Sequence, residues 1–260
     1  MSENVQAAQT PEKSGAVGEV VEIVKTVFYA LLIALVLRVL FFQPFTIPSA
    51  SMEPNLYQGD YIIVSKYSYG YSHHSIPFSP PLFRGRVFEK KPERGDVVVF
   101  KLPRDGHTDY VKRVVGLPGD RIQMKGGLVY LNGQPIRRTF AGTTKEDTGY
   151  GFVRDVASYR ETLPGGRSFL SNDFGADGEL DNTDVFVVPE GHYFMMGDNR
   201  DNSSDSRVPP EAGGVGYVPA ENLVGKAQII LLSWHPGASI LKPWTWVLDA
   251  RPSRFFRVLQ

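Results

Sequence analysis

The sequence predicts a mainly β fold preceded by one membrane-spanning helix, and three observations lead to this prediction. An apolar stretch covers residues 23–42. Beyond residue 45, apolar residues recur in short or alternating runs rather than at helical spacing. The 26 glycines and 19 prolines are spread along the chain, as expected for many turns between short strands. We expect one antiparallel, partly rolled β-sheet domain over residues 44–260.

The apolar stretch has the length and composition of a membrane span. As a helix, residues 23–42 extend over roughly 30 Å, the thickness of the hydrocarbon core of a bilayer. Only Lys25 and Arg38 carry charge, and Arg38 lies near the end, where it can reach the headgroups. Pro44 then ends the helix. We therefore predict a transmembrane helix over residues 23–43.

Two other interpretations of this stretch are open. One is a buried helix of a soluble core, but the apolar residues cover all faces, which suits lipid better. The other is a cleaved signal peptide, since Ser49, Ala50 and Ser51 are small like a cleavage site. Residues 1–25 hold four Glu and two Lys, whereas a signal peptide begins with a short basic segment. We predict a disordered tail over residues 1–22.

The strands of the β domain are predicted from runs bounded by Gly, Pro, Asn or Asp. Asn132–Gly133 is a strong signal for a tight hairpin turn. Residues 137–183 are polar and glycine-rich and interrupt the rhythm, so we predict a small polar insertion subdomain at about residues 125–185. The predicted strand regions are 60–67, 95–102, 109–116, 127–136, 184–197 and 225–234.

Composition excludes several kinds of site. The formal net charge is zero and no basic stripe is present, which argues against nucleic-acid binding. Without cysteine there are no disulfides and no thiolate metal sites. Residues 173–184 superficially resemble a calcium loop through Asp173, Asp177, Gly178 and Asp184, but Gly175 occupies the third position and the flanks are not helical. We expect a solvated loop there, and neither a metal nor a cofactor.

Common catalytic motifs are missing. There is no P-loop, no His-Glu-x-x-His and no Gly-x-Ser-x-Gly. Ser239 and Lys242 form a Ser-x-x-Lys pattern without the companion motifs of penicillin-binding enzymes. His107 and Asp109 could belong to a catalytic triad, but their spacing alone is not specific. None of the five histidines has a spacing that indicates zinc.

Two stretches are unusual for a plain β domain. Lys112 sits in a β-branched run, where alternation places it with Tyr110 and Val114 and opposite Arg113. A charged lysine on an apolar strand face is costly, so the alternative is an edge strand whose lysine reaches solvent. Residues 195–207, "MMGDNRDNSSDSR", are predicted to form a tight loop that hydrogen-bonds to itself.

Three motifs, in this order after an apolar span, resemble bacterial type I signal peptidases, also called leader peptidases. They are "PSASMEP", "YVKRVVGLPGD" and "GDNRDNSSDSR", and "ENLVGKA" adds a fourth. The resemblance runs from about residue 20 to residue 235. It implies a β-rich catalytic domain of signal-peptidase type and a membrane-anchored serine endopeptidase with a Ser/Lys dyad. Such an enzyme removes signal peptides from secreted preproteins after Ala-x-Ala-like sites.

The resemblance also assigns roles to residues. Ser51 matches the nucleophile, Lys112 the general base, and Ser49 the hydroxyl of the oxyanion hole. Ser203 matches the residue that orients the lysine. Asp205 and Arg207 match a supporting ion pair, and the positions near the substrate groove are Ile47, Pro48, Tyr110 and Val111.

Physical chemistry agrees with the role of Lys112. A lysine at its ordinary pKa is protonated at pH 7 and cannot accept a proton from Ser51. Burial without a carboxylate partner should lower its pKa by roughly 3 units. We expect a neutral amine that faces Ser51 and is held by Ser203, with Arg113 on the other face. Ala50 stands where the family commonly has glycine, a small change that should fit.

The implied partners are secreted preproteins and membrane lipid, without nucleic acid, and the protein is expected to be a monomer. The implied location is the bacterial inner (plasma) membrane, crossed once, with residues 1–22 in the cytoplasm and the catalytic domain on the periplasmic or outer side. Well-studied Gram-negative members have two spans and a longer insertion. Four C-terminal aromatics could dip into lipid or pack in the core: Trp244, Trp246, Phe255 and Phe256.

Other functions remain open at this point. The self-cleaving repressors of the DNA-damage response share the dyad, but they carry a DNA-binding helix-turn-helix where this chain has an apolar span. A specialised peptidase that matures pilus or conjugation components is a closer alternative. A catalytically inactive, membrane-anchored binding protein would need none of Ser49, Ser51, Lys112 and Ser203.

Overall fold

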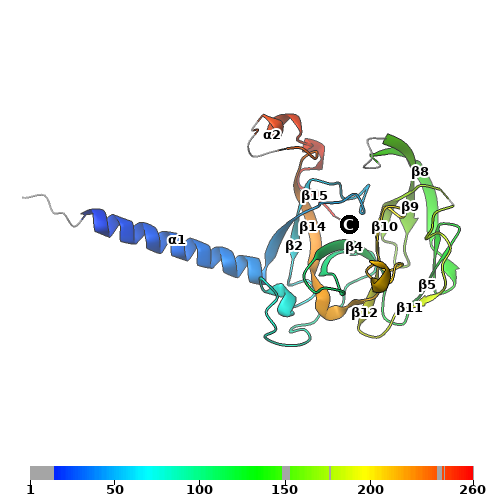
Figure 1. The fold of residues 1–260 in the computed structure, drawn as a ribbon, viewed down its shortest axis with the longest axis horizontal. Coiled ribbons are helices and arrows are strands. Elements are labelled where there is room, and N and C mark those ends of the chain that lie inside the picture. The colour runs from blue at the N-terminus through cyan, green and yellow to red at the C-terminus, as the bar shows by residue number, and fades with distance from the viewer. Residues whose placement is uncertain (1–14, 148–152, 176, 239–241, 243, 260) are drawn as a thin grey trace, which may run out of the picture. The chain divides into compact units, whose positions relative to one another are not determined.

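The structure is a computed structural model and describes residues 15–147, 153–175, 177–238, 242 and 244–259 (Figure 1). The chain divides into two compact units, residues 1–38 and residues 39–260. The first contains most of one long helix, and the second contains the β-strands.

Helix α1 spans Gly15–Leu40. Its segment Gly18–Leu40 has a mean hydropathy of 2.3 over its most apolar window, and none of that window is buried, so length and composition suffice to cross a membrane. The helix begins eight residues before and ends three residues before the predicted span of 23–43. Residues 15–22 are helical rather than a disordered tail, and the rest of that predicted tail, residues 1–14, lies outside the described residues.

Local chemistry accounts for the end of the helix. Within the helix, the exposed side chains of Lys25 and Glu22 pair at 3.2 Å one turn apart, which favours helix weakly. Near its end, Pro44 disfavours helix at the residue before it. Residues Phe42–Thr46 therefore form strand β1 instead of a last helical turn.

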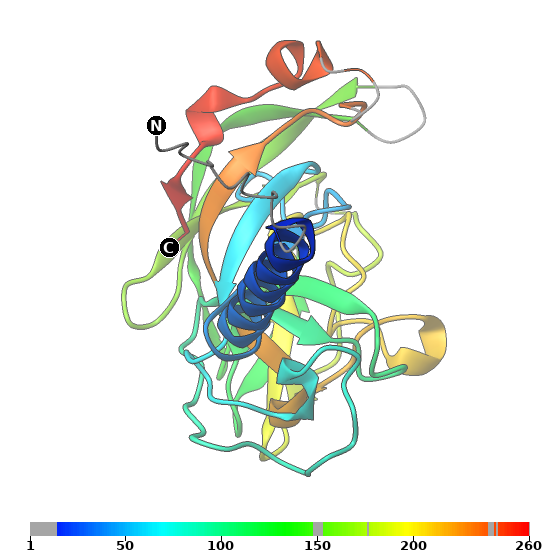
Figure 2. The same cartoon turned by 90° about the vertical axis from the view of Figure 1, so that its left-hand side faces the viewer.

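The main sheet is antiparallel and curled (Figures 1 and 2). Register shifts between β14 and β2 and between β12 and β4 mark bulges, which bend strands and increase their twist. The order of its strands is β1, β2 (Asp60–Ser65), β14 (Leu223–Ser233), β3 (Val97–Lys101), β4 (Asp109–Gly116), β12 (His192–Met196) and β13 (Val218–Pro219), with β15 (Arg257–Val258) paired to β14.

Two smaller sheets follow β4 in the chain. One has the order β11 (Phe186–Val187), β5 (Arg121–Lys125), β6 (Leu128–Leu131) and β7 (Gln134–Pro135). The other has the order β10 (Ser168–Asp173), β9 (Val153–Thr162) and β8 (Arg137–Asp147). The hairpin predicted at Asn132–Gly133 is confirmed: it joins β6 to β7, and both turn residues have positive φ, 52° and 81°.

The region predicted as a small polar insertion shares the core of the main domain. Ile136, Leu163 and Phe169 pack in one buried cluster with Phe194 and Met196 of β12. Its strands β8 and β9 escaped prediction because charged and polar side chains, not apolar ones, occupy much of their buried face. Residues 121–187 therefore form two sheets that are inserted into the main domain. Below, the name inserted sheet is used only for the sheet of β8, β9 and β10.

The remaining helical elements are short. They are α2 (Thr245–Leu248) and 3₁₀ turns at His73–Ser75, Pro210–Ala212, Ala220–Asn222 and Pro252–Arg254. Of the four C-terminal aromatics, Phe255 packs on Trp234 with ring centroids 5.9 Å apart. The other three, Trp244, Trp246 and Phe256, are exposed.

Candidate active site

Ser51 lies in a loop that directly follows β1, and we call residues 48–56 the nucleophile loop. Consecutive turns build it, with Glu53 N–H donating to Ala50 O at 3.0 Å and Leu56 N–H to Met52 O at 2.9 Å. Met52 and Leu56 are fully buried in the core beside the loop. Because these two apolar side chains anchor the nucleophile loop in the core, the position of the Ser51 hydroxyl is fixed.

Lys112 lies on β4, between β3 and β12, so the alternative of an edge strand is wrong. Its side chain is only 3% exposed. Its Nζ donates to Ser51 Oγ at 2.5 Å and lies 5.6 Å from the centroid of the Tyr110 ring. Strand alternation thus brings Lys112 to the nucleophile loop, as the face shared with Tyr110 indicated.

Burial lowers the pKa of Lys112 to about 8, from an ordinary value of 10.5. Asp205 and Asp198 act in the opposite direction and Arg207 adds to the lowering. Each of these carboxylates already has an arginine partner: Asp205 pairs with Arg207 at 2.8 Å and Asp198 with Arg113 at 2.7 Å. Within the described residues no carboxylate forms an ion pair with Lys112, so burial decides the direction.

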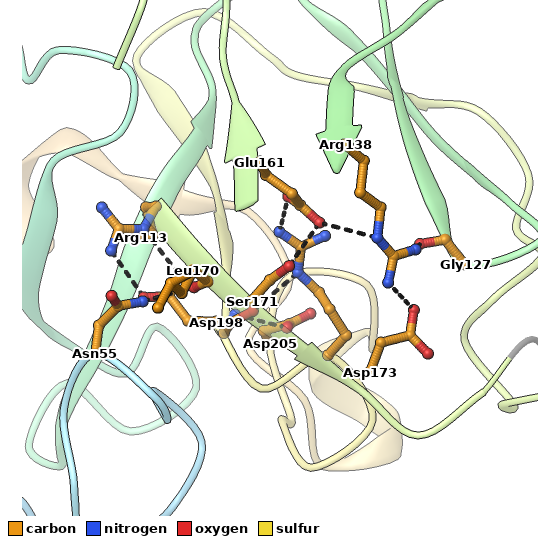
Figure 3. Close-up of polar contacts among 12 residues, drawn as sticks. Asn55, Arg113, Gly127, Arg138, Glu161, Leu170, Ser171, Asp173, Asp198 and Asp205 are labelled. Atoms are coloured by element: carbon orange, nitrogen blue, oxygen red, sulfur yellow. Dashed lines mark hydrogen bonds and ion pairs between the residues drawn. The ribbon is translucent and has the colours of Figure 1, made fainter. Parts of the chain in front are cut away.

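Arg113 occupies the opposite face of β4, as alternation predicts. It is 1% exposed, donates through two nitrogens to Asp198, and stacks over the Phe169 ring at 4.1 Å. Asn55, at the end of the nucleophile loop, donates to Asp198 Oδ2 at 2.7 Å and to Leu170 O at 2.6 Å (Figure 3). One face of β4 therefore carries Lys112, and the other carries Arg113, which supports the nucleophile loop through Asp198 and Asn55.

The loop of residues 197–207, which we call the polar loop, folds back on the end of β12. Gly197 N–H donates to Asp205 Oδ2 at 2.9 Å, and Ser206 N–H to Met195 O at 3.0 Å. A Cβ at Gly197 would lie 2.2 Å from Ser203 Oγ and 2.6 Å from Ser51 O. Only glycine therefore lets the polar loop approach the nucleophile loop this closely.

Ser203 differs from the expectation. It is buried beside Gly197, but its Oγ makes no hydrogen bond among the described residues, and the Lys112 amine donates to Ser51 instead. Ser49 is exposed and its Oγ lies 3.3 Å from Ser51 Oγ, within hydrogen-bond distance. Ser49, Ser51 and Lys112 are therefore in direct side-chain contact. Ser203 contributes to the site by packing against Gly197.

A cleft of about 540 Å³ opens beside these residues. All four predicted groove positions line it: Ile47, Pro48, Tyr110 and Val111. Ile47 is 3% exposed and packs into the core behind the cleft. The remaining lining residues include Asn202 and Ser204 of the polar loop, which sequence reasoning missed because nothing in the motif indicates which of its side chains face the cleft.

Comparison with known proteins decides the family. The family described as "Signal peptidase, peptidase S26" matches residues 20–234. The chain belongs to this signal peptidase family. Members are peptidases, so the protein is a hydrolase, and its relatives are bacterial type I enzymes.

Two relatives of the family show how far the likeness extends. A signal peptidase I of Rickettsia felis is 43% identical over 248 residues, which cover 89% of this chain and 90% of that protein. One of Rickettsia canadensis is 44% identical over 252 residues, covering 90% and 92%. A crystal structure of a signal peptidase I from Enterococcus faecalis V583 matches at 26% identity with a TM-score of 0.30, covering 53% of this chain and 97% of that chain. The family assignment rests on the sequence matches.

Membership of the signal peptidase family excludes the self-cleaving repressors, and the geometry disfavours a histidine triad. His107 is exposed, and Asp109 pairs with Lys101 at 2.9 Å.

Ala50 stands where the family commonly has glycine. Its backbone does not have a positive φ, so the methyl group of Ala50 is accommodated without strain.

Two carboxylates of the calcium-like segment are used within the protein: Asp173 pairs with Arg138, and Asp181 Oδ2 accepts Gly178 N–H at 2.7 Å. Asp177 and Asp184 of the pattern are exposed. Among the described residues, which leave out Ala176 of this segment, no three His, Asp or Glu side chains are grouped to hold a metal ion. Ser239, the first residue of the Ser-x-x-Lys pattern, lies outside the described residues.

Proposed function

We propose that the protein is a membrane-anchored serine endopeptidase that removes signal peptides from secreted preproteins. Ser51 is the nucleophile and Lys112 the general base. The contact between the buried Lys112 Nζ and Ser51 Oγ, 2.5 Å long and without a carboxylate partner, carries the proposal. A lysine pKa of about 8 keeps a useful fraction of the amine neutral near pH 7, as a general base requires.

The reaction follows from this geometry. The neutral amine of Lys112 accepts the Ser51 proton as Oγ attacks the carbonyl carbon of the scissile bond. The Ser51 N–H and the Ser49 hydroxyl donate hydrogen bonds to the oxyanion that forms. The ammonium of Lys112 then gives its proton to the leaving amine. A water, deprotonated by the same lysine, hydrolyses the acyl-enzyme and frees Ser51.

Specificity comes from the cleft beside Ser51. Ile47, Pro48, Tyr110 and Val111 present mostly apolar surface there. Shallow apolar pockets accept small side chains and exclude large ones, which suits cleavage after Ala-x-Ala-like sites. The roles of Ser203 and of the Asp205–Arg207 pair are to pack and support the polar loop behind Lys112.

Helix α1 supports the proposed location, in which it anchors the chain in the inner membrane. The catalytic domain then acts on the periplasmic or outer side, with the N-terminal tail in the cytoplasm. Ser51 follows the helix end at Leu40 by about ten residues, so the nucleophile begins the catalytic domain directly after the proposed anchor. A signal peptide held in the same membrane presents its cleavage site at that level. The proposed enzyme is a monomer without a cofactor.

The proposal is tested by cleavage of a preprotein with an Ala-x-Ala site by the detergent-solubilised full chain. We expect a product that begins immediately after the second alanine. Ser51→Ala and Lys112→Ala should each reduce the rate by roughly a thousandfold or more. Ser253→Ala, an exposed serine outside the cleft, is the control and should cleave like the wild type. Cleavage by Ser51→Ala at the wild-type rate would refute the assignment of the nucleophile.

A further inference from the structure

Glu146 is a buried carboxylate that the Ser/Lys chemistry does not use. It lies at the far end of β8 in the inserted sheet and is 2% exposed, whereas the neighbouring Lys145 is exposed. Its Oε1 accepts hydrogen bonds from Asn199 Nδ2 at 2.6 Å and from Asn202 Nδ2 at 2.9 Å. A single oxygen of the inserted sheet therefore holds two side chains of the polar loop.

Asn199 connects Glu146 to the nucleophile loop. Its Nδ2 also donates to Ala50 O at 3.2 Å, and its backbone N–H donates to Ser51 O at 3.2 Å. These two carbonyls belong to the peptide groups on either side of the Ser51 Cα. The position of the nucleophile thus depends on Asn199, and the orientation of the Asn199 amide depends on Glu146.

The direction of these contacts is fixed by chemistry. A carboxylate oxygen only accepts hydrogen bonds, so each asparagine must turn its NH₂ group towards Glu146. For Asn202, which is exposed and lines the cleft with Ser51 and Lys112, the amide oxygen is then held away from Glu146. Glu146 therefore sets one wall of the cleft as well as the nucleophile loop.

Other contacts attach the inserted sheet to the polar loop without Glu146. Arg200 Nη2 donates to Glu161 Oε2 of β9 at 2.5 Å, and Arg200 N–H donates to Asn172 O at 2.9 Å. Figure 3 shows this buried network, with Glu161, Arg138 and Asp173 on one side and Arg113, Asp198 and Asn55 on the other. Loss of the Glu146 carboxylate should therefore leave the fold in place and disturb orientation.

We propose that Glu146 is a positioning residue for the cleavage reaction, acting on Ser51 through Asn199 and on the cleft wall through Asn202. The inserted sheet is then part of the catalytic apparatus rather than an addition to it. Burial of Glu146 and Asn199 supports the assignment, because the hydrogen bond between these two side chains is shielded from competing water. This inference rests on the proposed function.

Steady-state cleavage of an Ala-x-Ala preprotein by the detergent-solubilised full chain tests the role. Glu146→Ala should lower kcat by about 10- to 100-fold and change KM by less than about threefold, since a small displacement of the nucleophile affects the chemical step. Glu146→Gln keeps an acceptor oxygen and should restore kcat to within about fivefold of the wild type. Glu190→Ala, an exposed carboxylate outside the cleft, is the control and should match the wild type.

A double-mutant cycle with Asn202→Ala separates positioning from stability. If Glu146 acts partly through Asn202, the double variant loses less kcat/KM than the product of the two single losses. Thermal unfolding of the same samples shows whether the fraction of folded protein has changed.

Three results overturn the inference. The first is an unchanged kcat in Glu146→Ala. The second is an equal loss in the Ala and Gln variants that follows the folded fraction. The third is two losses that simply multiply in the cycle. A wild type that does not cleave refutes the proposed function as well, whereas a cleaving wild type with an unaffected Glu146→Ala refutes this inference alone.

Discussion

Replacing Lys112 by Met should abolish cleavage and make the protein more stable at neutral pH. Methionine has a similar length and no charge, so it fills the same buried space on β4. In the folded state the Lys112 pKa is about 8, below its ordinary 10.5. The unfolded chain therefore binds this proton more tightly than the folded chain, and burial of the amine lowers the free energy of unfolding at any pH below about 8.

The magnitude follows from the shift. A difference of about 2.5 pKa units, at 1.36 kcal/mol per unit, gives about 3 kcal/mol. Loss of the hydrogen bond to Ser51 offsets about 1 kcal/mol of this gain. Lys112→Met should thus be about 2 kcal/mol more stable than the wild type at pH 7. The difference should shrink as the pH rises from about 8 towards 10.5, because the amine becomes neutral in the unfolded chain too.

Thermal unfolding followed by the fluorescence of the three tryptophans measures this difference at a series of pH values. At pH 7 we expect a Tm increase of roughly 4–8 °C, from about 2–4 °C per kcal/mol for a domain of this size. Lys125→Met, an exposed lysine over the Tyr130 ring, is the matched control and should show no pH-dependent difference. A Lys112→Met protein that is less stable than the wild type at pH 7, by an amount that does not vary with pH, would refute the reasoning.

Two further predictions concern the loops around the dyad. Gly197→Ala should lose at least about tenfold in kcat without unfolding, because the added Cβ meets Ser203 Oγ and Ser51 O. Steady-state cleavage measures the loss of kcat, and circular dichroism measures the fold. A fully active variant would contradict the close packing of the two loops at Gly197. Glu53→Gln should be more stable than the wild type at pH 8 and equal to it near pH 4. Burial, followed by repulsion from Glu146, raises the Glu53 pKa to about 7, so its contribution to stability is complete below 4.5 and is lost as the pH rises through 7. Thermal unfolding at both pH values tests this, and a difference that does not vary with pH would show that Glu53 titrates normally.

The elements that carry local patterns were predicted well. The predicted strand 109–116 has the bounds of β4, and alternation placed Lys112 and Arg113 on opposite faces. The Asn132–Gly133 turn followed from the need for positive φ at both residues. These features are local, since each depends on residues that are neighbours in the chain.

The features that were missed depend on distant partners. Glu146 and Glu161 occupy inward positions of β8 and β9, where apolar residues are expected, and Glu146 Oε1 and Glu161 Oε2 accept hydrogen bonds from Asn199 and Arg200 of the polar loop. No local pattern reveals a pairing between such distant residues, so the sequence predicted a polar insertion where the inserted sheet lies. Strand β1 was missed because Pro44, in its middle, argued for an end to regular structure.

The same limit applies to the active site. The motifs indicated Ser51 and Lys112 but not the Ser203 hydroxyl, which has no hydrogen-bond partner in the described part of the chain, or the hydrogen bonds of Asn199 to Ala50 and Ser51. These contacts depend on how the polar loop folds back beside the nucleophile loop. That approach is possible because of Gly197, whose importance is evident only from the space around it.

The pH dependence of kcat/KM tests the central claim, that a buried neutral Lys112 is the general base for Ser51. The full chain is assayed from about pH 6 to about pH 10 with a preprotein whose cleavage site has no group that titrates in this range. The account predicts a rate that rises about tenfold per pH unit and levels off near pH 8, the pKa of Lys112. A midpoint near 6.5, the ordinary pKa of histidine, or a rate independent of pH would contradict it.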